Sequence, residues 1–98
     1  AEADQENIKR QTLQKLTHLE AQIEASENKI ALLKHKESFL NESSSAQTRE
    51  YEAGKGDFSM PLKTRRDMVS VRYQLAAEQA KHTALIADFN HYFIEGEK

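Results

Sequence analysis

Cysteine is absent from this 98-residue chain, which excludes disulfides, thiolate metal sites and a cysteine nucleophile. Proline and glycine are scarce, with one proline and three glycines in total. No apolar run approaches the roughly 18 residues of a membrane span. The opening residues also lack the pattern of a secretory signal peptide. The sequence therefore predicts a soluble segment that is not itself embedded in a membrane.

Apolar residues and charge of one sign are also in short supply. The hydrophobic fraction is 38% and the charged fraction 31%, against roughly 45–50% and 25% in ordinary globular domains. A chain with a mean hydropathy of -0.81 is too polar to form the large packed core that surrounds a catalytic cleft. The 14 basic and 16 acidic residues nearly balance, whereas a nucleic-acid binder shows a basic excess. We therefore expect neither an enzyme nor a nucleic-acid partner.

The helix-breaking residues are concentrated at one place in the chain. Gly54, Gly56 and Pro61 fall within eight residues of each other, and Gly96 is placed to stop a helix near the C-terminus. The spacing predicts one helix over about 4–51, a tip over 52–59 and a second helix over about 60–95. Only the weak helix formers of residues 41–45 leave open whether the first helix is interrupted.

The apolar residues of the first half recur at the three-and-four spacing of a coiled-coil seam. They are Leu16, Leu19, Ile23, Ile30, Leu33 and Leu40. Ser26 and Glu37 interrupt this seam. The predicted fold class is all-α, a long antiparallel two-helix hairpin with coiled-coil-like packing.

The second half has two partly apolar stripes. The first comprises Leu62, Val69, Tyr73, Ala76, Ala80 and Ala87. The second comprises Met68, Val71, Leu75, Ile86, Phe89 and Phe93, and is interrupted by Glu78 and His82. A helix with two such stripes has neighbours on two sides. We therefore expect self-association, or a larger parent protein that covers the stripe left exposed by the hairpin.

The segment between the helices is typical of a helix end, a reversal and a helix start. Gly54 can adopt the left-handed conformation that closes a helix. Asp57 or Ser59 can cap the next helix, and Pro61 then falls in its first turn, where a missing N–H costs little. Three residues are expected to form an apolar plug at this tip: Tyr51, Phe58 and Leu62.

A tyrosine, a glycine and a leucine in this segment have a recognisable spacing. The pattern Tyr51-x-x-Gly54 is followed by Leu62 and by Arg65 or Arg66, and then by an alanine-rich return helix. Over residues 46–96 this pattern resembles the turn and return helix of the TolC family of outer-membrane efflux proteins. The chain has Pro61 before the leucine, where that family usually has valine. The first helix matches only in general character.

The resemblance implies a structural role in export. Hairpins of that family wall the periplasmic tunnel of a trimeric channel, and their tips meet a periplasmic adaptor (membrane fusion) protein that connects to an inner-membrane transporter. The chain would then be one hairpin of a larger outer-membrane protein of a tripartite pump. The residues expected to dock the adaptor are Tyr51, Gly54, Lys55, Gly56, Asp57, Phe58, Leu62, Arg65 and Arg66.

Each feature of the tip also has a plainer interpretation. The two glycines serve any tight turn, and the cations Lys55, Lys63, Arg65 and Arg66 fit a solvated surface as well as an anionic partner. The chain as a whole also fits a stand-alone helical-hairpin interaction protein, such as a secretion chaperone or a needle-type subunit. The Tyr51-x-x-Gly54 context favours the efflux hairpin.

The residue types that could carry chemistry lack the spacing that chemistry requires. His18, His35, His82 and His91 do not show the i, i+4 spacing of two metal ligands on one helix face. Met60 and Met68 are typical of packing residues more than of a copper site. Acidic pairs such as Glu20 and Glu24 lie on an expected solvated face. We predict no metal, no cofactor and no catalytic residue.

Overall fold

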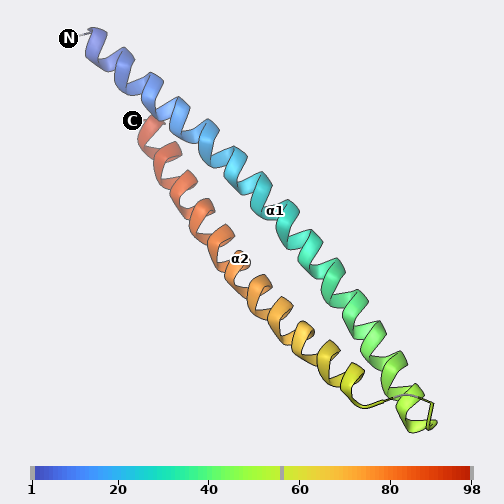
Figure 1. Cartoon of the computed structure of the whole chain (residues 1–98). Coiled ribbons are helices and arrows are strands. Elements are labelled where there is room, and N and C mark those ends of the chain that lie inside the picture. Colours follow the sequence, from blue (N-terminus) through green and yellow to red (C-terminus); the bar gives the residue numbers. More distant parts are fainter. Residues whose placement is uncertain (1, 56, 98) are drawn as a thin grey trace. The chain divides into compact units, whose positions relative to one another are not determined.

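The computed structural model describes residues 2–55 and 57–97, which form two helices joined by a turn. Helix α1 spans Glu2–Glu52 and helix α2 spans Ser59–Glu97 (Figure 1). The described ranges contain no strand. The predicted all-α helical hairpin is therefore confirmed. Each helix extends one or two residues beyond the ends expected from the sequence, and α2 continues through Gly96.

The chain divides into two compact units, each containing a part of both helices. We call the first the terminal unit; it combines Ala1–Asn28 with Gln79–Lys98. The second, Lys29–Glu78, contains the turn and is called the tip unit. Within each unit the α1 and α2 segments lie side by side and run in opposite directions (Figure 1).

The seam of the hairpin is the set of buried and half-buried positions that recur every three and four residues along both helices. On α1 these are Thr12, Leu16, Leu19, Ile23, Ser26, Ile30, Leu33, Glu37, Leu40, Ser44 and Gln47. On α2 they are Pro61, Thr64, Met68, Val71, Leu75, Glu78, His82, Leu85, Phe89 and Tyr92. A strict alternation of three and four keeps one face of each helix toward its partner. All six apolar positions predicted for α1 belong to this seam.

On α2 the structure corrects part of the predicted stripe. The second predicted stripe coincides with the seam at Met68, Val71, Leu75 and Phe89. Its other members Ile86 and Phe93 are 39% and 48% exposed, and the buried seam residue is Leu85. The spacing of three and four from Leu75 leads to Glu78, His82 and Leu85, so a strict count selects Leu85 over Ile86. The predicted stripe contains only apolar residues, so it departs from the three-and-four spacing after Leu75, where Glu78 and His82 occupy the seam.

Polar seam residues pair across the two helices. In the tip unit, the Thr64 hydroxyl donates a hydrogen bond of 2.7 Å to the Gln47 Oε1 atom. The buried carboxylate of Glu78 lies 3.5 Å from the Lys29 ammonium. In the terminal unit, the half-buried His82 Nε2 lies 3.2 Å from Glu27 Oε1. These pairs compensate for part of the cost of placing polar groups in a narrow seam.

Helix α1 is continuous through residues 41–45, where the sequence left an interruption open. Serine and asparagine are weak helix formers, but each costs only a fraction of about 1 kcal/mol relative to alanine. Ser44 occupies a seam position, and Leu40 and Gln47 on either side are also half-buried against α2. Packing of this face is sufficient to hold the helix, because tertiary contacts outweigh small differences in propensity.

Ser26 is the seam residue without a visible compensation. It is 2% exposed, and its Oγ is buried with no hydrogen-bond partner among the described residues. An unsatisfied buried hydroxyl costs about 1–3 kcal/mol. We expect Ser26→Ala to raise the free energy of unfolding by about 1 kcal/mol more than Ser45→Ala, an exposed control with the same gain in helix propensity. Urea denaturation of both variants measures this, and equal gains would contradict it.

Candidate functional site at the hairpin tip

Helix α1 ends in a Schellman motif centred on Gly54. The Gly54 N–H donates to the Tyr51 carbonyl at 2.9 Å, and the Lys55 N–H donates to the Glu50 carbonyl at 2.9 Å. Gly54 has a φ of 75°, the left-handed conformation that this motif requires. The closing role predicted for this glycine is confirmed. The motif turns the chain out of α1 and pairs two carbonyls that the helix end leaves without an intrahelical partner.

Helix α2 begins with a cap supplied by Asp57. Its Oδ1 accepts a hydrogen bond of 2.6 Å from the Ser59 backbone N–H. The Leu62 N–H donates to the Phe58 carbonyl at 3.3 Å, which is the first bond of the helical pattern. Pro61 therefore lies among the first residues of the helix, whose N–H groups have no intrahelical acceptor. Of the two caps that the sequence allowed, the structure selects Asp57.

The aromatic side chains of the tip contact each other across the turn. The rings of Tyr51 and Phe58 lie with centroids 5.1 Å apart and planes tilted by 47°. Two of the three residues predicted to form the apolar plug therefore contact each other. Tyr51 remains 46% exposed and Phe58 48% exposed. Leu62, the third residue of the predicted plug, is also exposed. The tip therefore presents an apolar surface to solvent. The end of α1 and the start of α2 fix the positions of its side chains.

Exposed cations lie close to this apolar surface in the sequence. Lys55, Lys63, Arg65 and Arg66 are all exposed. The first turn of α2 contains no acidic residue, so the positive end of its dipole is offset there only by the Asp57 cap that precedes it. The tip is therefore suited to a partner with an apolar patch and anionic groups. Gly56, also expected at the docking surface, lies outside the described residues.

The carboxyl of Asp57 has a pKa below its usual value of 3.8, because the Ser59 hydroxyl and then the Ser59 backbone N–H donate hydrogen bonds to the charged form. A group whose pKa falls on folding stabilises the fold above its unfolded pKa and loses this contribution as the pH falls through its folded pKa. We therefore expect the cap to weaken below about pH 4.

The matched variant for this prediction is Asp57→Asn, which retains a side-chain acceptor but cannot titrate. The melting temperature of the original chain should exceed that of the variant near neutral pH. This difference should shrink as the pH falls from about 6 to about 2.5, while all other carboxyls cancel in the comparison. A difference that stays constant over this range would show that the charge of Asp57 does not contribute.

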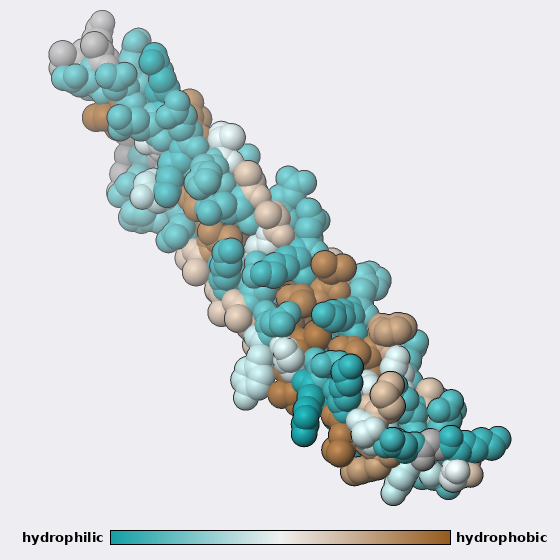
Figure 2. All heavy atoms as spheres, in the orientation of Figure 1, coloured by the Kyte–Doolittle hydropathy of each residue, from teal (hydrophilic) through white to brown (hydrophobic). Residues whose placement is uncertain are grey.

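The outer stripe is the first apolar stripe of α2, and it faces away from the seam. Its members Leu62, Val69, Tyr73, Ala76, Ala80 and Ala87 are all exposed. Tyr73 is 75% exposed and Val69 is 51% exposed. On the face shown in Figure 2, apolar atoms are interleaved with hydrophilic ones and are most frequent over the tip unit. The alanines leave room for another helix backbone to approach closely.

Of the other candidates for chemistry, Met60 is 54% exposed, and His18 and His35 are exposed as well. Met68 is buried in the seam, and His91 Nε2 lies 3.4 Å from Glu95 on the next turn of α2. Among the described residues no group of three or more histidine, aspartate or glutamate side chains is arranged to hold a metal ion. Within the same ranges, neither helix has a stretch apolar and long enough to cross a membrane.

Comparison with known proteins adds no relative. No protein-family model, curated protein or solved structure matches this chain.

Proposed function

We propose that this hairpin is a structural element of a TolC-like outer-membrane efflux protein. In this role the helices wall a periplasmic export conduit, side by side with the hairpins of other protomers in a trimer. The tip docks a periplasmic adaptor protein, and the adaptor connects the channel to an inner-membrane transporter. The chain itself performs no chemistry.

The geometry of the tip supports this proposal most directly. The Tyr51-x-x-Gly54 pattern that resembles the family coincides with a Schellman turn that fixes the reversal at Gly54. This turn places Tyr51 against Phe58 and leaves both rings half exposed. Tyrosine and arginine are enriched among the anchor residues of protein interfaces, and Arg65 and Arg66 follow this turn in the early part of α2. A turn that only connected two helices would not need an exposed aromatic pair.

The outer stripe supports the second part of the proposal. A two-helix hairpin buries one face of each helix, and a further exposed stripe of apolar and small residues indicates another helix as neighbour. A channel wall built from adjacent hairpins supplies such a neighbour. In this arrangement the seam holds each hairpin together and the outer stripe of α2 joins it to the wall.

A cross-linking experiment in the cells that make this protein tests the docking role. A photoreactive phenylalanine analogue replaces Phe58 in the full protein, and the adducts formed on illumination are identified by mass spectrometry. We expect an adduct with a periplasmic adaptor protein. Phe39, which is 65% exposed on α1, is the matched control because it is an exposed phenylalanine in the middle of a helix. The same adducts from both positions, or none from Phe58, would contradict tip docking.

A further inference from the structure

Charge is distributed unequally between the two units, although the whole chain is nearly balanced. The terminal unit contains nine acidic and five basic residues, a net charge of -4. The tip unit contains seven acidic and nine basic residues, a net charge of +2. Together these give the net charge of -2 of the chain. Two copies therefore attract each other when the terminal unit of one lies against the tip unit of the other.

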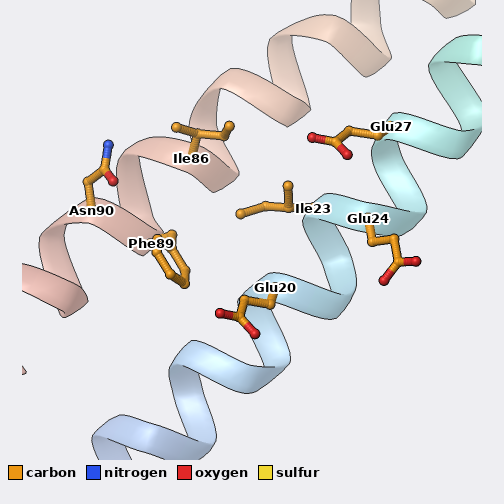
Figure 3. A pocket seen from close by; sticks show the side chains of 7 residues that line it. All are labelled: Glu20, Ile23, Glu24, Glu27, Ile86, Phe89 and Asn90. Atoms are coloured by element: carbon orange, nitrogen blue, oxygen red, sulfur yellow. The ribbon is translucent and has the colours of Figure 1, made fainter.

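Three acidic side chains of the terminal unit line the edge of an apolar furrow. The furrow lies between α1 and α2, and Figure 3 shows Ile23 and Phe89 pointing toward each other across it, with Glu20 and Glu27 on either side of Ile23. Glu24, Ile86 and Asn90 complete the lining. All three glutamates are exposed. The furrow is open to solvent, so it fits the side of another helix better than an enclosed small molecule.

The tip unit has a surface with the complementary chemistry. The outer stripe there begins with Leu62, Val69 and Tyr73, which are exposed apolar residues at helical spacing. Arginines at positions 65, 66 and 72 lie along the same part of α2 and are exposed. Arg72 Nε is also 3.7 Å from Glu37 within the tip unit. This part of α2 is an apolar helix face bordered by cations, as the furrow requires of its occupant.

We propose that the furrow of one copy binds the outer stripe of the tip unit of a second copy. The contact is reciprocal, so a pair of chains forms it twice, as in a two-fold symmetric dimer. In each contact Val69 and Tyr73 lie against Ile23, Ile86 and Phe89. Glu20 and Glu24 of the furrow face the arginines of α2, whereas Glu27 lies 3.2 Å from His82 of its own copy.

This pairing goes beyond the proposed function and does not depend on it. Hairpins in a channel wall all point in one direction, whereas the reciprocal pair joins unlike units. The pair also covers Val69 and Tyr73 of the outer stripe, so the two copies must separate before those residues can join a wall. The dimer is therefore a form of the hairpin outside the assembled channel.

Charge reversal on one partner and then on the other tests the pairing. The first variant combines Glu20→Lys with Glu24→Lys, and the second combines Arg65→Glu with Arg66→Glu. Each variant alone brings like charges together in both contacts, so each should dimerise roughly tenfold or more weakly than the original chain. In an equimolar mixture the altered furrow meets the altered stripe and the original furrow meets the original stripe. The mixture should therefore dimerise more strongly than either variant does alone.

Analytical ultracentrifugation at about 0.1 mM protein and low salt measures these states. Circular dichroism confirms that each variant is still helical. Glu42→Lys, at an exposed site outside both surfaces, controls for a gain of positive charge elsewhere on the chain. A monomeric original chain would overturn the proposal, and so would variants that dimerise as the original does or a mixture that stays monomeric. If the original chain stays monomeric, a basic apolar helix from another protein would be the better occupant of the furrow. None of these results bears on the cross-link at Phe58, so the two proposals fail separately.

Discussion

Leu33→Ala is expected to lower the free energy of unfolding by about 2–4 kcal/mol, the usual range for a leucine truncated in a packed core. Leu33 is 6% exposed at the seam of the tip unit. The described seam contains few large apolar side chains that are fully buried, so little surrounding material can move to fill the cavity. Since domains of this size are stable by only about 5–15 kcal/mol, a loss of this size should be evident as a large fall in melting temperature.

The neighbouring residue provides the control. Leu32 is 67% exposed, and Leu32→Ala changes the same side chain in the same helix without opening a cavity. We expect this variant to differ from the original chain by no more than about 0.5 kcal/mol. Urea denaturation followed by circular dichroism compares the two. Equal losses at both positions would show that the register of the seam is wrong.

Gly54→Val is expected to have the second largest effect, through the backbone alone. A Cβ built on Gly54 meets no atom within 4 Å, so the first side-chain carbon causes no clash. The φ of 75° is nevertheless a conformation that side chains rarely adopt, and β-branched ones least of all. We expect a loss of about 2–3 kcal/mol for valine and about 1–2 kcal/mol for alanine.

Asparagine distinguishes strain from other causes at the same site. It tolerates the left-handed conformation better than other residues with a side chain, so Gly54→Asn should be the least destabilised of the three variants. The valine variant should also lose the adaptor cross-link from Phe58, because relaxing the turn displaces the Tyr51 and Phe58 rings. Equal melting temperatures for all three variants would contradict the Schellman geometry. An unchanged cross-link in the valine variant would contradict the proposed docking surface.

The sequence was sufficient to predict the fold, because local signals and apolar spacing agreed. Long stretches without glycine or proline, one cluster of breakers and a three-and-four spacing together predict two helices around one turn. The left-handed Gly54 and the first-turn position of Pro61 followed from the special backbone of these residue types. Each of these features depends on neighbours close in the sequence.

The register of α2 was harder to predict, since polar residues occupy its seam. Glu78 and His82 interrupt the apolar pattern, and between them and Phe89 both Leu85 and Ile86 are candidates. The cross-helix partners Lys29 and Glu27 that accommodate the two polar residues lie about 50 positions away in the chain. A strict alternation from Pro61 onward selects the right residues, but only if polar side chains are accepted in the seam.

The two interaction surfaces follow from what the seam leaves exposed. The aromatic contact at the tip was anticipated because Tyr51 and Phe58 flank a tight turn. The acidic furrow was not, because it combines residues of both helices that only the antiparallel pairing brings together (Figure 3). From the sequence alone, the glutamates of α1 fit an ordinary solvated face, and Ile86 and Phe89 fit an apolar stripe of the second helix. Their position beside each other is a property of the folded hairpin.

Cell fractionation is the most direct test of the proposed role in an efflux channel. An antibody raised against this chain is used to blot the soluble, inner-membrane and outer-membrane fractions of the cells that produce it. A channel hairpin predicts a band several times larger than the 11.2 kDa of this chain, confined to the outer-membrane fraction. A band near 11.2 kDa in the soluble fraction would contradict the channel and would instead favour a stand-alone hairpin that binds partner helices.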